Sequence, residues 1–187
     1  MMYLTIRKGS NVKMTKWNVD ATHTNVGFSV RHMMVSRVRG SFGKVEGAVE
    51  GDPLKLEDAK INFNIDVSTI DTNNEDRDNH LRSADFFEVE KYPNITFEST
   101  KIVETGADEY DVTGNMTIKD VTKETTFKVE RTGEGVNPWG VKVVGFEADT
   151  KISREAFGLT WNQALETGGV LVGDDIKINV ELQVNPV

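Results

Sequence analysis

Apolar residues recur at every second position over most of this chain, and this alternation predicts β-strands that bury one face. The last stretch is the clearest, because residues 176, 178, 180, 182 and 184 are all Ile, Val or Leu. Residues 61, 63, 65 and 67 repeat the pattern, with Asn62, Asn64 and Asp66 on the opposite face. Counting such runs predicts about eight or nine strands, mostly antiparallel, which favours an all-β sandwich or closed barrel.

Clusters of Gly, Asp, Asn and Pro separate these runs and predict turns. They include residues 133–135 (Gly-Glu-Gly), Asn137-Pro138 and residues 173–175 (Gly-Asp-Asp). The Gly-rich stretches lack the residues of a phosphate-binding loop or a dinucleotide fingerprint, so they indicate turns and no nucleotide cofactor. We expect no cofactor of any kind.

The composition excludes several classes of site. The 187 residues contain no Cys, so a disulfide framework, a thiolate zinc site and a cysteine nucleophile are impossible. The three His have no metal-ligand spacing, and we expect no metal, although three His assembled in space stay an open alternative. A formal net charge of −8 argues against general nucleic-acid binding. No apolar run is long enough to span a membrane as a helix.

Residues 74–86 break the alternation and predict a short helix inserted between strands. Asn73 and Asn74 are suited to cap it, and Asp78 and Arg82 have the spacing of a surface ion pair. This segment holds the densest cluster of ionisable groups in the chain, namely Arg77, Asp78, His80, Arg82 and Asp85. It is interpreted first as a charge-paired connector at one end of a barrel, with two alternatives: a site for a ligand headgroup, or a His80–carboxylate general base.

His32 continues the parity of the apolar residues in its strand, so we expect it on the dry side. There it is either a hydrogen-bonded core residue or a polar contact inside a pocket. The aromatic residues pose a similar choice, because six Phe lie in six different predicted strands and Phe157, Leu159 and Trp161 alternate in a further segment. The interior of a barrel this size is either filled by side chains or open to one apolar ligand.

The first residues are expected to lie outside the fold. Residues 1–13 are interpreted as an unstructured extension, a tag remnant or a misassigned start before Met14, and residues 14–187 as one barrel domain. The start has neither a continuous hydrophobic segment nor a small-residue cleavage site, so we expect no secretory signal and a cytoplasmic protein.

Several ordered motifs resemble the YceI-like family, from about Trp17 to the C-terminus. The most recognisable is RDNHLRSADFF at residues 77–87, followed by YPNITF at 92–97. The others are DATHTNVGFSVRH at residues 20–32, GNMTIKDVT at 114–122, ISREAFGL at 152–159 and VGDDI at 172–176. The resemblance implies an export signal in many relatives, and we expect none in this chain.

The resemblance implies an extended, lipocalin-like antiparallel β-barrel, often a homodimer, whose lumen holds a polyisoprenoid or an isoprenoid quinone-type lipid. It implies binding, storage or transport rather than catalysis. Arg77, His80 and Arg82 are our candidates for the lipid headgroup, chosen by charge. Two alternatives stay open: an enzyme that uses His32, His80 and nearby carboxylates on a hydrophobic substrate, and a packed barrel that serves as a stress-related interaction module. The expected lumen lining is Phe28, Val30, His32, Phe63, Ile65, Phe97, Phe127, Phe146, Phe157, Trp161, Ile178 and Val180.

Overall fold

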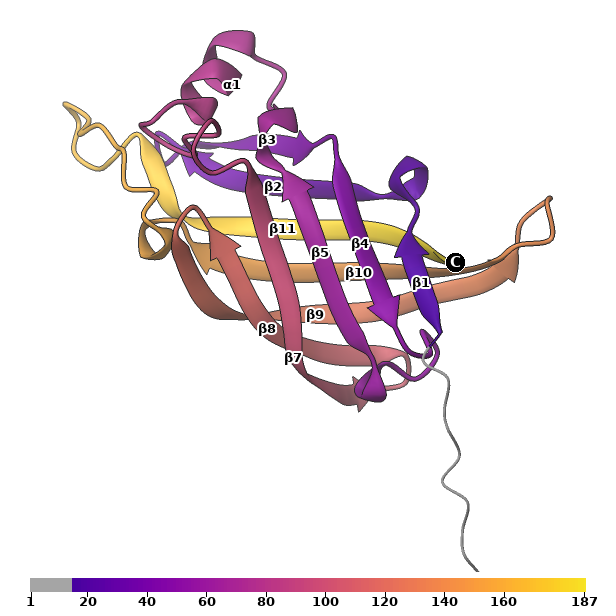
Figure 1. Ribbon diagram of the computed structural model, residues 1–187. Coiled ribbons are helices and arrows are strands. Elements are labelled where there is room, and N and C mark those ends of the chain that lie inside the picture. The colour runs from indigo at the N-terminus through magenta and orange to yellow at the C-terminus, as the bar shows by residue number, and fades with distance from the viewer. Residues whose placement is uncertain (1–14) are drawn as a thin grey trace, which may run out of the picture.

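Strand segments form one antiparallel sheet that closes on itself in the computed structural model, which describes residues 15–187 (Figure 1). The predictions made for residues 1–13 lie outside the described residues. No helix within the described part is long and apolar enough to cross a bilayer. The elements in chain order are β1 (Lys16–Val19), a 3-10 turn η1 (Ala21–His23), β2 (Asn25–His32), β3 (Ser36–Phe42), β4 (Val45–Glu50), η2 (Leu56–Asp58), β5 (Lys60–Asp66), η3 (Val67–Thr69), β6 (Ile70–Asp71), α1 (Glu75–Arg82), β7 (Asn94–Gly106), β8 (Glu109–Ile118), β9 (Val121–Val136), β10 (Lys142–Ser153), η4 (Glu155–Phe157) and β11 (Val172–Pro186).

The barrel has eight strands once interrupted segments are joined. β11 pairs with β2 along one stretch and with β1 along another, because η1 divides a single bent strand into β1 and β2. β3 and β4 are likewise two parts of one strand, and so are β5 and β6 on either side of η3. The remaining members of the ring are β7, β8, β9, β10 and β11. The predicted all-β barrel of about eight strands is therefore confirmed.

Asp20 stabilises the bend between β1 and β2. Its carboxylate accepts hydrogen bonds from the backbone N–H of Thr22 at 3.0 Å and from the Thr22 hydroxyl at 2.7 Å, and it lies 2.9 Å from Nδ1 of His23. The Thr22 and His23 hydrogen bonds hold the pKa of Asp20 below its usual value. This arrangement satisfies donors that the sheet leaves unpaired where the strand turns.

The strand register places the alternating apolar residues inside the barrel. Val30, Phe28 and Val26 of β2 lie opposite Ile176, Ile178 and Val180 of β11. Because successive side chains point to opposite faces, both sets point inward together and their neighbours point to solvent. The buried residues form one apolar cluster that continues around the ring. The interior is thus the dry face that the alternation predicts.

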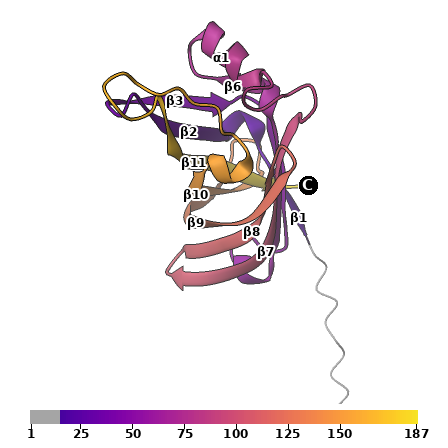
Figure 2. The same ribbon diagram turned by 90° about the vertical axis from the view of Figure 1, so that its left-hand side faces the viewer.

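The predicted helix between strands is present as α1. Asn74 caps it, with its Oδ1 accepting a hydrogen bond from the Arg77 N–H at 3.0 Å. The predicted Asp78–Arg82 pair is not among the ion pairs of residues 15–187. Asp78 is buried and accepts instead from the backbone N–H of Thr72 at 2.9 Å, so packing against the barrel replaces the surface pair. Figure 2 shows α1 lying over one end of the barrel.

Two predicted turns lie within strands. Residues 133–135 belong to β9, which runs on to Val136, and the chain reverses at Asn137, whose Oδ1 accepts from the N–H groups of Trp139 and Val141. Residues 173–175 belong to β11, where the register with β2 shifts between Val172 and Ile176. Irregular strand pairing accommodates both glycine stretches, and a single-sequence turn pattern does not reveal such pairing.

Candidate ligand-binding lumen

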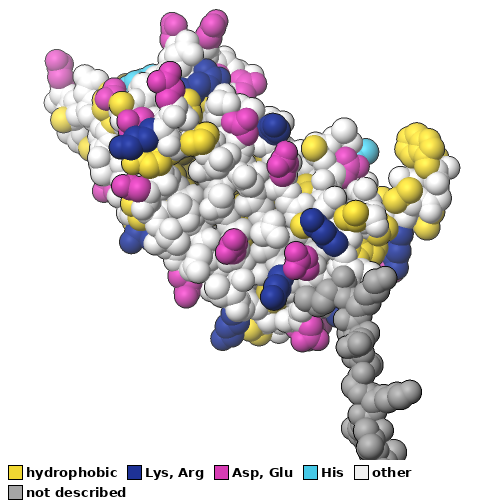
Figure 3. All heavy atoms as spheres, in the orientation of Figure 1, with side chains coloured by type: hydrophobic (Ala, Val, Ile, Leu, Met, Phe, Trp, Pro, Cys, Tyr) yellow, Lys and Arg dark blue, Asp and Glu magenta, His cyan; other side chains and the backbone are white. Residues whose placement is uncertain are grey.

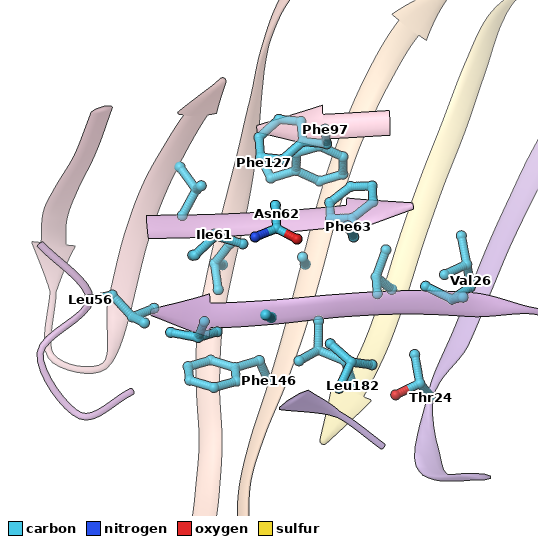
Figure 4. Close-up of a pocket in the computed structure, with 18 residues that line it drawn as sticks. Thr24, Val26, Leu56, Ile61, Asn62, Phe63, Phe97, Phe127, Phe146 and Leu182 are labelled. Carbon is cyan, nitrogen blue, oxygen red and sulfur yellow. The ribbon is translucent and has the colours of Figure 1, made fainter. Parts of the chain in front are cut away.

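The barrel encloses two adjacent apolar compartments. The first has a volume of about 70 Å³ and lies toward the β1 side, where Phe146, Leu182 and Leu56 point into it (Figure 4). The second has a volume of about 110 Å³ and is bounded partly by Leu81 of α1 and by Phe86. Residues common to both walls are Val26, Phe63, Phe127 and Val180.

These compartments suit an oily guest better than water. Each compartment exceeds the roughly 10–15 Å³ that a single water needs. The walls are almost entirely apolar, however, and a trapped water requires two to four polar partners. An apolar ligand loses nothing by lacking such partners, so the physical chemistry of the lumen favours hydrocarbon.

Three aromatic rings meet where the compartments adjoin. Phe63 stacks on Phe97 with centroids 4.9 Å apart and 12° between planes. Phe127 contacts both rings edge-on, at 6.0 Å from Phe63 and 5.2 Å from Phe97. We call Phe63, Phe97 and Phe127 the aromatic waist. It narrows the lumen without introducing a polar group.

Arg154 is the one charged side chain among the residues that line the two compartments. It is 2% exposed, and burial lowers the pKa of its guanidinium. Nε donates to the Gly173 carbonyl at 2.7 Å, and Nη1 donates to the carbonyls of Leu159 and Trp161 at 2.6 and 2.9 Å. Nη2 donates to the Val172 carbonyl at 3.2 Å. Of five guanidinium N–H groups, two thus hold the loop before β11 and two hold the first residues of β11, which leaves one uncommitted.

Sequence reasoning missed Arg154 as a lumen residue. It sits inside the motif at residues 152–159, and a buried position is unusual for Arg. The available signal was the inward parity of Ile152, which predicts that residue 154 points inward as well if the strand continues.

Nine of the twelve residues expected in the lumen line it, and three do not. His32 is half-buried at the end of β2, beyond the compartments. Phe157 is buried in η4, and Trp161 packs against His80 and Phe86 with ring centroids 4.7 and 5.3 Å away. The nine are Phe28, Val30, Phe63, Ile65, Phe97, Phe127, Phe146, Ile178 and Val180.

The headgroup candidates lie on α1 and are occupied by contacts of their own. Arg77 donates through Nε and Nη2 to the hydroxyl and carbonyl of Thr72 at 2.8 and 2.7 Å. Arg82 donates to the carbonyls of Ser68 and Ile70 at 2.9 and 3.0 Å. These bonds fasten α1 to the barrel.

His80 occupies a different setting on the same helix. Its Nε2 lies 2.9 Å from the Asp85 carboxylate, and its ring meets Phe86, a lumen residue, edge-on at 5.1 Å. Neither His80 nor His32 lines either compartment, so the geometry does not bring the two imidazoles together at the lumen. Among residues 15–187, no three His, Asp or Glu gather as metal ligands.

A closed antiparallel barrel around an apolar lumen defines a lipocalin-like protein. A family model described as YceI-like domain matches residues 17–184, and UPF0312 protein SERP2314 of Staphylococcus epidermidis is 43% identical over 91% of this chain and 97% of its own length. The chain belongs to the YceI-like family.

Solved structures share this fold. Burkholderia cenocepacia BcnA has a TM-score of 0.77 and 27% identity, covering 88% of this chain and 98% of BcnA. A polyisoprenoid binding domain from Saccharophagus degradans, implicated in plant cell wall breakdown, has a TM-score of 0.66 over 94% of this chain and all of that domain. Its 13% identity shows the common fold alone.

Proposed function

We propose that this protein binds an isoprenoid lipid, either a polyisoprenoid or a quinone with an isoprenoid tail, and stores or carries it in the barrel lumen. The observation that carries the proposal is the adjacent pair of apolar compartments inside the barrel. Membership of the YceI-like family supports it, and the fold is shared with a domain that binds polyisoprenoids. We propose binding rather than catalysis.

Burial of the tail supplies the affinity. Each buried CH₂ contributes about 0.8 kcal/mol, so a five-carbon unit contributes roughly 3–4 kcal/mol before ordering costs. A few units then give micromolar or tighter binding, which corresponds to about −8 kcal/mol. The side chains proposed to contact the tail are the nine predicted residues that line the compartments.

The headgroup needs polar partners near the second compartment. Arg77, His80 and Arg82 stay our predicted candidates, and His80 has the closest link to the lumen through its contact with Phe86. We add Arg154, whose uncommitted N–H is suited to a phosphate or quinone oxygen in an otherwise apolar wall. A polar group there orients the lipid more than it adds to affinity.

A variant that fills the first compartment tests this function. Ala148 is buried and lines that compartment, whereas its neighbour Glu147 is exposed on the outer face. Ala148→Phe should weaken binding of geranylgeraniol and of a short-tailed quinone at least about tenfold in equilibrium dialysis, because the ring occupies space that the tail needs. Glu147→Phe adds the same ring outside and should bind as the wild type does. Equal binding by both variants would contradict a lumen site.

Two further predictions accompany the function. The family resemblance implies a homodimer, which sedimentation equilibrium measures directly. The expected cytoplasmic location is tested by fractionation of the source cells, with the protein found in the cytosolic fraction if the prediction is right.

A further inference from the structure

Cations gather on the outer face of one part of the barrel. Arg31 of β2 lies opposite Arg37 of β3, and Lys177 of β11 lies opposite Lys151 of β10. Like charges directly opposite each other on neighbouring strands destabilise a sheet, yet two such pairs occur on adjoining strands of a chain with net charge −8. We call Arg31, Arg37, Arg39, Lys128, Lys151 and Lys177 the basic face.

Most cations of the basic face form no ion pair within residues 15–187, although Lys128 lies opposite Asp149 of β10 and Asp111 of β8 in the register. Arg37, Arg39 and Lys177 line one outer groove, together with Lys128, Lys151 and the carboxylate of Asp149. Among the described residues, only Lys151 of this set forms an ion pair, with Asp175 at 3.5 Å. The groove therefore presents a positive surface to solvent, and its natural complement is an anionic one.

An exposed apolar turn projects at the end of the same strands. Met33, Met34 and Val35 connect β2 to β3, with exposed fractions of 48%, 62% and 87%. Met33 and Met34 have φ of +53° and +59°, a conformation that favours Gly or Asn. The chain thus holds long apolar side chains in solvent at positions where small polar residues fit better. We call residues 33–35 the apolar tip.

We propose that the apolar tip and the basic face together dock this protein on an anionic lipid bilayer. A bilayer surface offers phosphate charge above hydrocarbon, which matches cations beside a protruding apolar turn. A nucleic acid offers the charge without an apolar phase to receive Met34 and Val35. The bilayer matches both features.

Docking in this orientation brings one end of the lumen to the membrane. The N–H of Met33 donates to the Leu171 carbonyl at 2.8 Å, and the neighbouring residues Val30 and Val172 line the second compartment. This consequence rests on the proposed lipid binding, because a carrier must exchange its lipid with a bilayer. The docking itself needs only the outer surface.

Vesicle co-sedimentation of the full chain tests the proposal. Vesicles of pure phosphatidylcholine are compared with vesicles in which a quarter of the lipid is phosphatidylglycerol, at low salt and at about 0.5 M salt. We expect binding to the anionic vesicles only, weakened by salt. Arg31→Glu with Arg37→Glu should reduce it at least about tenfold, and Met34→Ser with Val35→Ser should reduce it severalfold.

Two control variants test whether vesicle binding depends on the basic face and the apolar tip in particular, or on any change of charge or exposed apolar surface. Lys60→Glu with Lys101→Glu makes the same charge change on exposed positions of β5 and β7, and should bind like the wild type. Trp139→Ser removes the 84% exposed Trp at the β9–β10 hairpin, which projects from the opposite end of the barrel, and should also have no effect (Figures 1 and 3). Equal loss in either control would overturn the proposal.

Other outcomes also decide it. Absence of binding to anionic vesicles, equal binding to neutral ones, or tighter binding to a short DNA duplex than to vesicles would each contradict bilayer docking. Mass spectrometry of bound lipid distinguishes this result from the proposed function, because the Arg31/Arg37 variant should retain the same lipid as the wild type. If the wild-type protein docks on anionic vesicles but carries no bound lipid, the docking proposal stands and the proposed lipid binding in the lumen is contradicted.

Discussion

The rings of Phe63 and Phe97 lie nearly parallel, 4.9 Å apart, on neighbouring strands β5 and β7. The two residues are directly opposite in the register, so the pair is a cross-strand contact as well as part of the aromatic waist. Phe63 alone of the two borders both compartments. Phe63 therefore stands, with Val26, Phe127 and Val180, where the two parts of the lumen adjoin.

Replacing Phe63 with a smaller residue should change the isoprenoid chain length that the lumen prefers. Phe63→Ala removes the ring from the waist, so we expect it to shift preference toward longer isoprenoid chains while lowering the free energy of unfolding by about 3 kcal/mol. Phe63→Leu keeps more of the volume and should lie between the two proteins in both respects. Affinities for an isoprenoid alcohol series and urea unfolding measure the effects. An unchanged chain-length preference in Phe63→Ala would show that the waist does not limit the ligand.

Gly114 gives Phe97 its space. A Cβ at Gly114 would lie 2.2 Å from the Glu98 carbonyl oxygen and 2.7 Å from the Phe97 ring. Gly114→Ala should therefore destabilise the fold by about 3 kcal/mol or more in urea unfolding. At Gly133 a Cβ would meet nothing within 4 Å, so Gly133→Ala should change stability by less than about 0.5 kcal/mol. Similar losses for both variants would contradict the packing described for the waist.

Arg154 should matter for stability as well as for the ligand. Arg154→Met removes the guanidinium that donates to the carbonyls of Gly173, Leu159 and Trp161, and we expect a loss of about 3–5 kcal/mol in unfolding free energy. The Val172 carbonyl keeps a donor in Nδ2 of Asn162. Arg154→Lys keeps the positive charge but not the planar set of guanidinium donors, so it should recover only part of the lost unfolding free energy. Arg39→Met removes an exposed Arg and should be nearly neutral. A neutral Arg154→Met would mean that the loop before β11 does not depend on the guanidinium.

The lowered pKa of Asp20 predicts a contribution to stability that depends on pH. Hydrogen bonds from Thr22 and His23 favour the charged carboxylate in the folded state. Asp20 therefore stabilises the fold above its ordinary pKa of 3.8, and this contribution is lost as pH falls through the lower folded value. Because the group is partly exposed, we expect Asp20→Asn to cost only about 0.5 kcal/mol at neutral pH.

Urea unfolding of both proteins across this range checks the sign. The stability difference between wild type and Asp20→Asn should be constant from pH 7 to about 5 and should shrink at lower pH. A difference that grows as the pH falls would mean that the folded pKa of Asp20 is raised.

Alternation predicts the barrel because it is a local property that every strand repeats. It correctly predicts that Phe28 and Ile178 point into the barrel, because the face on which a side chain lies follows from its position in the alternating pattern. It does not predict where a strand bends or bulges, because those depend on neighbours distant in sequence. The positions of residues 173–175 within β11 and of Trp161 against His80 follow from such tertiary packing.

Charge is a weaker guide to the site than parity. Arg77 and Arg82 were chosen by charge and location, and the structure shows their guanidinium groups bonded to the barrel backbone. Arg154 is buried beside the lumen, and only its parity with Ile152, not its charge, indicates an inward position. The difference from an exposed Arg lies in four carbonyl groups that only the folded chain brings together.

The mass of the protein as isolated from its own source, without detergent, tests the central claim most directly. Native mass spectrometry should show a species heavier than the chain by one lipid, and collisional release should yield a molecule built of five-carbon isoprenoid units. A population that carries no adduct, together with no isoprenoid in its organic extract, would contradict the account.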